Sequence, residues 1–520
     1  MPEFEFVNVG RPDDVKRHST KIRRHVMKDI GKARRRPKRR GQTTVDEQVV
    51  SDLAAAAAAG PSGGPSPGAA ASAGEAEAEA EAEPHDLAAA AASLAFANPN
   101  VDGTLSAMVY PTEMDEVRLN LARYMFAEAR ANYRPFRFPW MSMGLSDPAA
   151  WHITMANAVL FRGMKPGSAK PDYNSSLEAM KWYTRSLESI TRRLADPAES
   201  GSEGLIVAVA GFICHDSSTG NFTRQEVHMK GLKRLVEDRG GLEELNSPFL
   251  RLMISWHDLL GASYRNSAPL FGVPKGSITE IDAGADMEYL EGLLETWGRR
   301  CGSLGDIASA MRATAAVASY INRRCGGDAN FWRDEVKAAR LLAPALHEVL
   351  SLEGRPLPDR PGDDDAGYSA TAAREAFRRA ALLFLASVKV RFGAAAHEIA
   401  RHLDAFRQIS QLPCVDWAFV PELNLWAQVT CALHETGANR AWNVVIVVGI
   451  MDALGLETSA QALDLVRRIM WVDALGEGGK LDSLCREIDA LVASNGVRGG
   501  QGAMNMPPDT HHSQAFAGES

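Results

Sequence analysis

The stretch from His397 to His402 has the residue types of a zinc-binding helix, in which two histidines four residues apart hold one metal ion. Here the histidines are five residues apart, which separates them by about 140° around a helix. Arg401 occupies the position that the second histidine would need. The spacing therefore predicts no metal site, and the ordinary alternative is exposed or partly buried histidines on a helix.

Two other stretches contain catalytic residue types without catalytic spacing. Gly476 to Leu481 has the glycines and lysine of a phosphate-binding loop, but Leu481 replaces the hydroxyl that binds magnesium, so we expect a turn between helices. Cys214, His215 and Asp216 are consecutive, and neighbouring residues on a helix point away from one another. The sequence predicts no enzyme, no catalytic residue and no cofactor. An enzyme whose site assembles only in three dimensions is the remaining alternative.

The cysteines do not have the spacing of a zinc site. No two of them are closer than 17 residues: Cys214, Cys301, Cys325, Cys414, Cys431 and Cys485. This spacing predicts reduced, unligated thiols. The N-terminus has no apolar signal segment, and no apolar run reaches the roughly 20 residues that a membrane span needs. We therefore expect a protein that is neither secreted nor membrane-spanning.

The basic arm, residues 1–41, departs furthest from an ordinary composition. It contains 14 Lys and Arg against 5 Asp and Glu, a net charge of +9, whereas the remaining 479 residues have a net charge of −17. Such a charge asymmetry indicates the kind of partner that a protein binds, and it carries no information about the fold. The run beyond Gly31 is broken at Pro37 and predicts a nuclear-import signal read by importin, made of Arg34, Arg35, Arg36, Lys38, Arg39 and Arg40. A solvated charge run without a receptor is the alternative.

A short amphipathic helix is expected before this signal. Ile22, Val26 and Ile30 recur every fourth residue after a capping Ser19 or Thr20. The opposite side carries the cations with which the arm could contact nucleic-acid phosphates, namely Arg23, Arg24, Lys28 and Lys32. Contacts of this kind would position the protein on a nucleic acid without reading its bases.

The composition changes twice after the arm. Residues 42–104 contain alanine runs and a Glu-Ala alternation, and they predict a disordered linker because few large apolar groups offset the entropy of ordering. From 105 to 495, apolar residues recur at helical spacing and strand signals are almost absent, which predicts an all-α, large multi-helix array. Residues 496–520 are expected to be a disordered tail.

Helix signals within this array fix several expected boundaries. Residues 111–112 predict the start of a helix whose apolar stripe includes Val117, and residues 147–148 (Asp-Pro) predict the start of a second. A third helix is expected from 173 to 194, with Leu177 on its buried face. The apolar segment from Gly204 to His215 predicts a central buried helix, for which a strand is the competing interpretation.

The most informative stretch of the array runs from Val227 to Leu242. Leu232, Leu235 and Val236 predict one helix face, and Gly240-Gly241 predict its end in left-handed backbone conformations that glycine adopts without strain. Gly231 lies inside this helix, where it costs about 1 kcal/mol relative to alanine. We therefore expect another helix to approach closely at Gly231.

These residues resemble a known family. Residues 227–242 and the following LMISWHD (252–258) are similar to the helical regulatory domain of fungal-specific transcription factors, in which a helix ending in Arg-Gly-Gly precedes a Trp-containing helix. FEFVNVGRPDD and IRRHVMKDIGKARRR resemble the opening of members without a zinc cluster, and 470–473 (MWVD) resembles the closing Trp-containing helix of the domain. The motif residues are His228, Gly231, Arg239, Gly240, Gly241 and Trp256.

The resemblance implies a nuclear, non-enzymatic transcriptional regulator. Its partners would be the transcription machinery or other regulators, and its helical body would bind such partners or a small molecule. Members of this group usually bind DNA through a cysteine-rich zinc cluster, but this chain has no cysteine before Cys214, so recognition of DNA through zinc is not expected. The alternative is a helical interaction scaffold whose arm binds RNA or acidic partners and which does not regulate transcription.

Overall fold

The computed structural model describes only part of the chain. The described residues are 105, 108–128, 137–164, 176–277, 287–300, 305–328, 330–352, 365–393, 396–412 and 417–503. All regular elements within these ranges are helices, sixteen α-helices with short 3-10 and π segments, which confirms the all-α prediction. The basic arm and the expected linker lie outside the described residues. The last α-helix continues to Ala503, into the segment expected to be a tail.

The chain divides into two compact units. Unit 1 comprises Met1–Thr279 and Trp332–Ser351, and unit 2 comprises Glu280–Phe331 and Leu352–Ser520. The helical array that the sequence predicts from 105 to 495 is therefore built around two cores, so each unit is described by itself.

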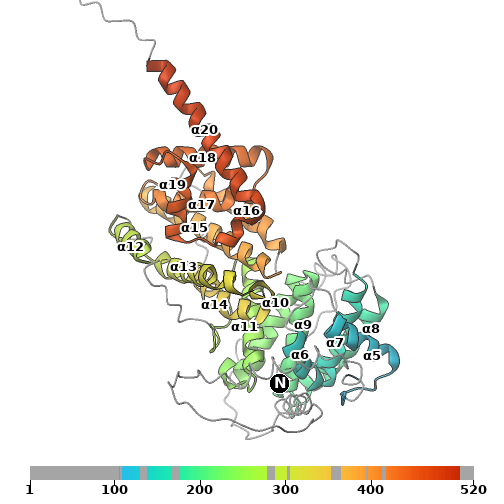
Figure 1. Ribbon diagram of the computed structural model, residues 1–520. Coiled ribbons are helices and arrows are strands. Elements are labelled where there is room, and N and C mark those ends of the chain that lie inside the picture. The colour runs from blue at the N-terminus through green and yellow to red at the C-terminus, as the bar shows by residue number, and fades with distance from the viewer. Residues whose placement is uncertain are drawn as a thin grey trace, which may run out of the picture. The chain divides into compact units, whose positions relative to one another are not determined.

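Unit 1 is built from the helices α5 (Glu116–Arg123), α6 (Arg137–Leu145), α7 (Pro148–Arg162), α8 (Leu177–Ala195), α9 (Glu203–Thr219), α10 (Phe222–Asp238), α11 (Pro248–Arg265) and α14 (Glu335–Ser351), with the π segment η1 (Tyr124–Glu128) and the 3-10 turn η3 (Leu242–Glu244). α9 is its central element, because it packs against α7, α8, α10 and α11 (Figure 1). Nearly all of its side chains are buried. This result confirms the prediction of a central buried helix at residues 204–215.

Local capping explains where the helices of unit 1 begin. The Asp147 carboxylate accepts hydrogen bonds from the backbone N–H groups of Ala149 and Ala150, and Pro148 occupies the first helical position of α7. Ser176 caps α8 and Ser247 caps α11 in the same way. The predicted start at residues 147–148 is thus confirmed.

Two predicted helix faces are wrong near their starts. α5 begins only at Glu116, because Asp115 supplies the cap, and Val117 in its first turn is 58% exposed. Leu177 at the start of α8 is 77% exposed. The large rings of Trp182 and Tyr183 are buried instead, and they turn α8 so that Leu177 points outward.

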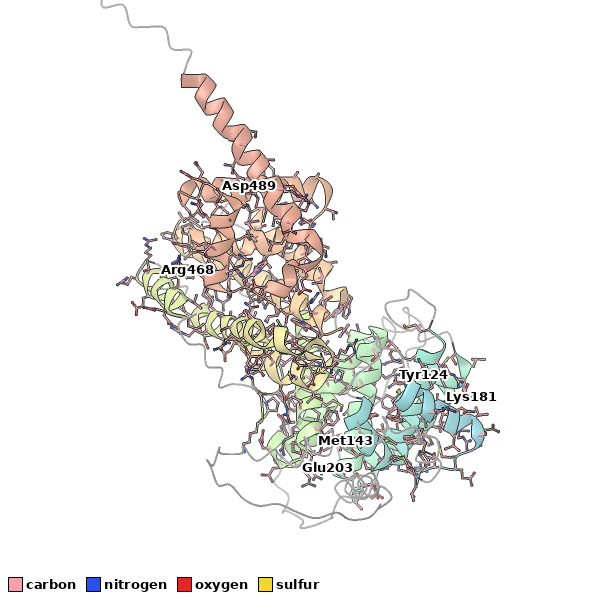
Figure 2. The ribbon with its side chains drawn as sticks, viewed as in Figure 1. Tyr124, Met143, Lys181, Glu203, Arg468 and Asp489 are labelled. Atoms are coloured by element: carbon pink, nitrogen blue, oxygen red, sulfur yellow. The ribbon has the colours of Figure 1, made fainter. Side chains whose placement is uncertain are left out.

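Unit 2 is built from α12 (Glu288–Arg300), α13 (Ile307–Arg324), α15 (Asp365–Arg391), α16 (Ala396–Ser410), α17 (Pro421–Ala432), α18 (Gly437–Ala453), α19 (Ser459–Ile469) and α20 (Lys480–Ala503), with the 3-10 segments η6 (Cys325–Gly327) and η8 (Asp473–Gly479). The short segment η7 (Phe331–Arg333) crosses the sequence boundary between the units. α15 packs against α16 and α17, and α17 packs against α18 and α19. Asp489, which Figure 2 labels on α20, accepts hydrogen bonds from the backbone N and the Oγ of Ser459 and so anchors the start of α19.

The core of unit 2 contains a buried ion pair that joins α15 to α16. The Lys389 ammonium donates to the Glu398 carboxylate, and both side chains are fully buried. Burial raises the pKa of Glu398, but the neighbouring Lys389 and His402 outweigh that effect and lower it to about 2. No helix within the described ranges is long and apolar enough to cross a membrane.

Candidate functional site

The predicted sites of the basic arm are not among the described residues. They are the import residues Arg34, Arg35, Arg36, Lys38, Arg39 and Arg40 and the phosphate-contact residues Arg23, Arg24, Lys28 and Lys32. Their roles stay predictions.

Asp216 is the centre of a buried polar cluster in unit 1 that includes one of the motif residues. Its Oδ1 accepts a hydrogen bond from Nε of Arg224 at 2.6 Å, and its Oδ2 accepts one from Nδ1 of His228 at 2.8 Å. Burial raises the pKa of the Asp216 carboxyl, but Arg224 and His228 outweigh burial and lower that pKa below its ordinary value. His228 therefore joins α10 to α9 through a charged partner within the core.

The three consecutive residues at 214–216 contact three different partners. Cys214 Sγ lies 3.1 Å from Nε2 of His257 in α11, and Nδ1 of His215 lies 2.7 Å from Oδ1 of Asn157 in α7. Asp216 faces α10 instead. The sequence-based expectation that these side chains point away from one another is correct, and together they attach α9 to its neighbours.

The Cys214 and His257 pair is the arrangement closest to a catalytic one in unit 1. Burial raises the pKa of the Cys214 thiol to about 12 and lowers that of His257 to about 4. Both groups are therefore neutral near pH 7, and Cys214 lacks the thiolate that a nucleophile needs. The two residues are 43 positions apart, so no local pattern in the sequence could have paired them.

The glycines of the motif behave in two ways. Gly240 and Gly241 have φ angles of +108° and +115°, and their N–H groups bond to the carbonyls of Glu237 and Val236, which completes a Schellman motif at the end of α10. This confirms the predicted helix end. The predicted close approach at Gly231 is wrong, because a Cβ added there would meet no atom within 4 Å. Gly231 borders open space and not a packed helix.

The two remaining motif residues also have structural contacts. Nη1 of Arg239 donates to the carbonyl oxygen of Gly201 at 2.7 Å, and its Nη2 lies 3.5 Å from Oε2 of Glu203. These contacts tie the end of α10 to the start of α9. Trp256 is buried in α11. The motif therefore assembles the core of unit 1 around α9, and it does not form an open site.

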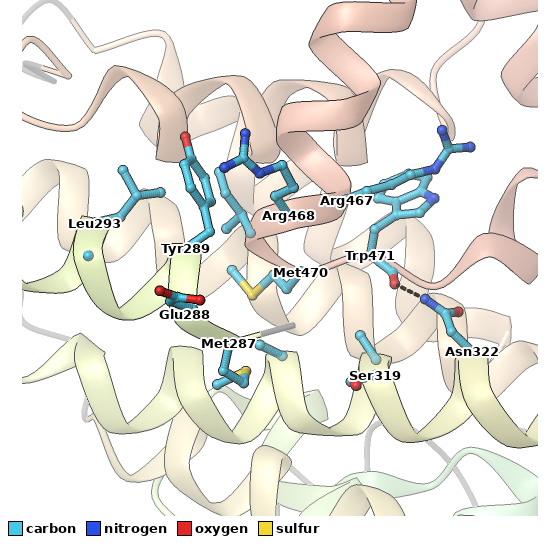
Figure 3. A pocket seen from close by; sticks show the side chains of 14 residues that line it. Met287, Glu288, Tyr289, Leu293, Ser319, Asn322, Arg467, Arg468, Met470 and Trp471 are labelled. Atoms are coloured by element: carbon cyan, nitrogen blue, oxygen red, sulfur yellow. Dashed lines mark hydrogen bonds between the residues drawn. The ribbon is translucent and has the colours of Figure 1, made fainter. Parts of the chain in front are cut away.

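Unit 2 contains a pocket of about 770 Å³ between α12, α13 and the end of α19. Three segments that are far apart in the sequence line it: Met287, Glu288, Tyr289, Gly292 and Leu293; Ala315, Ala318, Ser319 and Asn322; Arg467, Arg468, Ile469, Met470 and Trp471 (Figure 3). Sequence reasoning missed this pocket, because none of the three segments has a binding pattern of its own.

One charged group of the pocket, the Arg468 guanidinium, stacks on an aromatic ring. The guanidinium carbon of Arg468 lies 3.7 Å from the centre of the Tyr289 ring, and Figure 3 shows the two side chains next to each other. Burial raises the pKa of the Tyr289 hydroxyl, and Arg468 opposes that rise. Nε of Arg467 lies 3.2 Å from Oδ1 of Asp473, so the charge of Arg467 is compensated.

Trp471 was expected in a closing helix, but it lies just after one. α19 ends at Ile469, and Met470 has an extended backbone. The indole N–H of Trp426 donates to the carbonyl of Met470 at 2.7 Å, and Nδ2 of Asn322 donates to the carbonyl of Trp471 at 2.8 Å. These distant partners hold the segment extended, so Met470, Trp471 and Val472 lie outside the closing helix that the resemblance implies.

The two motifs that resemble enzyme sites are structural in unit 2. His397 is exposed on α16 as expected, whereas His402 is fully buried and not partly exposed, and Glu398 pairs with Lys389. The glycine stretch forms the turn η8 between α19 and α20, with positive φ at Gly478 and Gly479. Within the described ranges no group of three or more His, Cys, Asp or Glu could hold a metal ion.

Comparison with known families identifies this architecture. The fungal-specific transcription factor domain matches residues 125–413, more than half of the 520 residues. The chain belongs to the fungal-specific transcription factor domain family, and its role is therefore in transcription regulation. The matched range contains the α10 motif and Trp256, whereas 470–473 and the N-terminal stretches lie outside it. Comparison with curated proteins and with solved structures found no match.

Proposed function

We propose that this protein is a nuclear transcriptional regulator that works without a zinc-cluster module. The observation that carries the proposal is the family match over residues 125–413. The charge division of the chain adds support, because a basic arm of net charge +9 precedes a body of net charge −17. In this proposal residues 1–41 deliver the protein to the nucleus, 42–104 are a linker, 105–495 are the regulatory domain and 496–520 are a tail.

The regulatory domain acts by binding and not by catalysis. The buried titratable groups in the described part of unit 1 support this reading, because Asp216 is paired with Arg224 and His228, and Cys214 and His257 are both neutral. The partners of the domain are other regulators or the transcription machinery. This assignment follows from the family and from the absence of a poised nucleophile among those groups.

The arm has two proposed roles that use different residues. Importin reads the cluster from Arg34 to Arg40, and nucleic-acid phosphates contact Arg23, Arg24, Lys28 and Lys32. Because no cysteine precedes Cys214, the arm positions the protein on nucleic acid without selecting a sequence. Choice of target genes then depends on partner proteins bound to the helical body.

Transcript profiling tests the proposed function directly. Three strains are compared, with the natural protein, with no protein, and with a variant in which the six import residues are alanine. The proposal expects the third profile to match the second, because the variant stays outside the nucleus. A variant that restores the natural profile would exclude regulation that depends on the arm, and identical profiles in all three strains would exclude a regulatory role.

Gel-shift titration separates this function from the alternative, a scaffold whose arm binds RNA or acidic partners. The full chain is titrated with genomic duplex DNA and with structured RNA over a range of salt concentrations. We expect binding to DNA that weakens steeply with salt, because phosphate contacts release counterions. Binding to structured RNA that exceeds binding to DNA at every salt concentration would favour the scaffold.

A further inference from the structure

We propose that the pocket between α12, α13 and the end of α19 binds a small organic anion with an apolar body, and that Arg468 binds the anionic group. The inference deepens the proposed regulatory function, because the ligand would be an effector of the regulator. Only this effector role rests on the proposed function. Binding itself depends only on unit 2.

The dimensions and walls of the pocket suit a small molecule. Its volume of about 770 Å³ lies within the range of roughly 300 to 1,000 Å³ that is usual for small-molecule sites. Residues with little or no side chain create the hollow, namely Gly292, Ala315 and Ala318. Met287, Leu293, Ile469 and Met470 add apolar side chains to the lining, beside the polar, charged and aromatic residues already named. Apolar walls of this kind favour a ligand with a hydrophobic body.

Arg468 supplies the group that would recognise an anion. Its guanidinium stacks on the Tyr289 ring at 3.7 Å, and no carboxylate of the described residues forms an ion pair with it. The stacked geometry leaves the edge of the guanidinium free for the planar, two-pronged hydrogen bonding that suits a carboxylate, sulfonate or phosphate. An organic anion would therefore give Arg468 the charged partner that no described carboxylate of the protein supplies.

The other charges of the lining do not cancel this preference. Arg467 is paired with Asp473 at 3.2 Å. Glu288 is exposed, and Figure 3 shows its carboxylate pointing away from the Arg468 guanidinium. Arg468 is exposed as well, but it is the lining cation that stacks on an aromatic ring and forms no ion pair with a described carboxylate. Glu422 and Asp464 raise the pKa of the Tyr289 hydroxyl, but neither carboxylate lines the pocket.

Binding would connect elements that are distant in the sequence. Arg468 lies in the last turn of α19, whereas Tyr289 lies in the first turn of α12. Asn322 of α13 already braces this region, because its side chain bonds to the carbonyl of Trp471 and to the N–H of Asp473. A ligand that contacts Arg468, Tyr289 and the small residues of α13 together would stabilise the packing of these helices, as an effector requires.

Two fluorescent probes test the charge preference in the purified full chain. 1-Anilinonaphthalene-8-sulfonate and N-phenyl-1-naphthylamine share one apolar body, and only the first carries a sulfonate. We expect Arg468→Gln to weaken binding of the sulfonate probe about tenfold, the value of one charge-assisted hydrogen bond, and to change binding of the neutral probe less than twofold. Arg299→Gln is the matched control on α12, because Arg299 is exposed and does not line the pocket.

A filling variant tests the location of the site. Gly292 lines the pocket, and a Cβ added there meets no atom within 4 Å, so Gly292→Phe should fill the space without disturbing the fold. Gly298→Phe is its control, since Gly298 is also in α12, has equal room and lies outside the lining. We expect Gly292→Phe to abolish one saturable site for both probes, while Gly298→Phe retains it.

The outcomes separate this proposal from the proposed function. Unchanged sulfonate binding in Arg468→Gln, an equal loss for both probes in that variant, or unchanged binding in Gly292→Phe with circular dichroism like that of the natural protein would each overturn the pocket proposal. None of these results depends on gene control. Transcript profiling of Gly292→Phe then tests the effector role, which is wrong if the profile equals that of the natural protein although the probe site is lost.

Discussion

Asp216 Oδ1 and Arg224 Nε lie 2.6 Å apart in the core of unit 1, and both side chains are almost completely buried. The Arg224 guanidinium also lies 5.0 Å from the centre of the Tyr183 ring. This ion pair joins α9 to α10 at the position where the family motif supplies His228 as a second partner. A charged pair in such a place is sensitive to the loss of either member, because the other stays buried without compensation.

Removal of the Asp216 charge should destabilise unit 1. We expect Asp216→Asn to lower the free energy of unfolding by about 3 to 5 kcal/mol, because the buried Arg224 and His228 would lose the charge of the carboxylate that they share. Hydrogen exchange of the α10 amides measures the effect within unit 1. Lys230→Gln is the control, since its pair with Glu226 is largely exposed and should contribute less than about 1 kcal/mol. Equal effects of the two variants would contradict the structural role of the pair.

Gly231 should tolerate a side chain, whereas Gly240 should not. Gly231→Ala places a methyl group in open space inside α10, and we expect it to stabilise the helix by up to about 1 kcal/mol. Gly240→Ala should destabilise unit 1 by about 1 to 2 kcal/mol because φ is +108° there. The same exchange measurement compares the two variants. If Gly231→Ala were destabilising, this result would support the close approach of another helix that the sequence predicts.

Asp258 should make the stability of unit 1 depend on pH. Burial raises the pKa of this carboxyl to about 6, although the N–H groups of Phe271 and Leu270 oppose the rise. Since the folded pKa exceeds the unfolded value of about 3.9, the stability that Asp258 contributes is complete below pH 4 and is lost as pH rises through 6. Asp258→Asn removes this loss and keeps an acceptor for both N–H groups.

The stability of Asp258→Asn relative to the natural protein should therefore rise between pH 4 and pH 7. The expected change is roughly 3 kcal/mol, from a shift of about two pKa units. Hydrogen exchange of the α11 amides at several pH values gives the difference in stability between the variant and the natural protein. Groups that titrate in the same way in both proteins cancel in this difference. A difference that stays constant over this range would show that Asp258 titrates normally.

The Trp426 indole should be required for the extended segment after α19. Trp426→Phe removes the buried hydrogen bond from Nε1 to the Met470 carbonyl, and we expect a loss of about 1 to 3 kcal/mol, measured by exchange of the α17 amides. Trp442→Phe is the control, because Trp442 is 57% exposed and its change should stay within about 0.5 kcal/mol. A similar result for both variants would mean that Met470 finds another donor.

Local patterns predicted those features of the fold that depend on neighbours in the sequence. The Asp147 cap, the buried α9 and the glycine end of α10 each follow from residues within a few positions of one another. Leu177 is exposed, against the prediction, because the larger Trp182 and Tyr183 occupy the buried face of α8. Val117 is exposed because α5 begins only at Glu116 and places it in the first turn. Trp471 was misplaced because its backbone conformation depends on Trp426 and Asn322, which are distant in the sequence.

The pocket shows the same limit of prediction more strongly. Its aromatic ring, its small floor residues and its arginine come from segments near 289, 318 and 468, and no short motif links them. The sequence indicates only one member of the polar cluster of unit 1. His228 belongs to the family motif, whereas its partner Asp216 stands out only as part of the consecutive triplet 214–216, which lacks catalytic spacing.

Nuclear import through the arm tests the central claim most directly. The measurement is the nuclear-to-cytoplasmic fluorescence ratio of the full chain fused to a fluorescent protein. The account predicts that alanine at Arg34, Arg35, Arg36, Lys38, Arg39 and Arg40 leaves the fusion in the cytoplasm. Alanine at Arg23, Arg24, Lys28 and Lys32, in the same arm, should leave it nuclear. A six-alanine variant that accumulates in nuclei like the unmodified fusion would contradict the account.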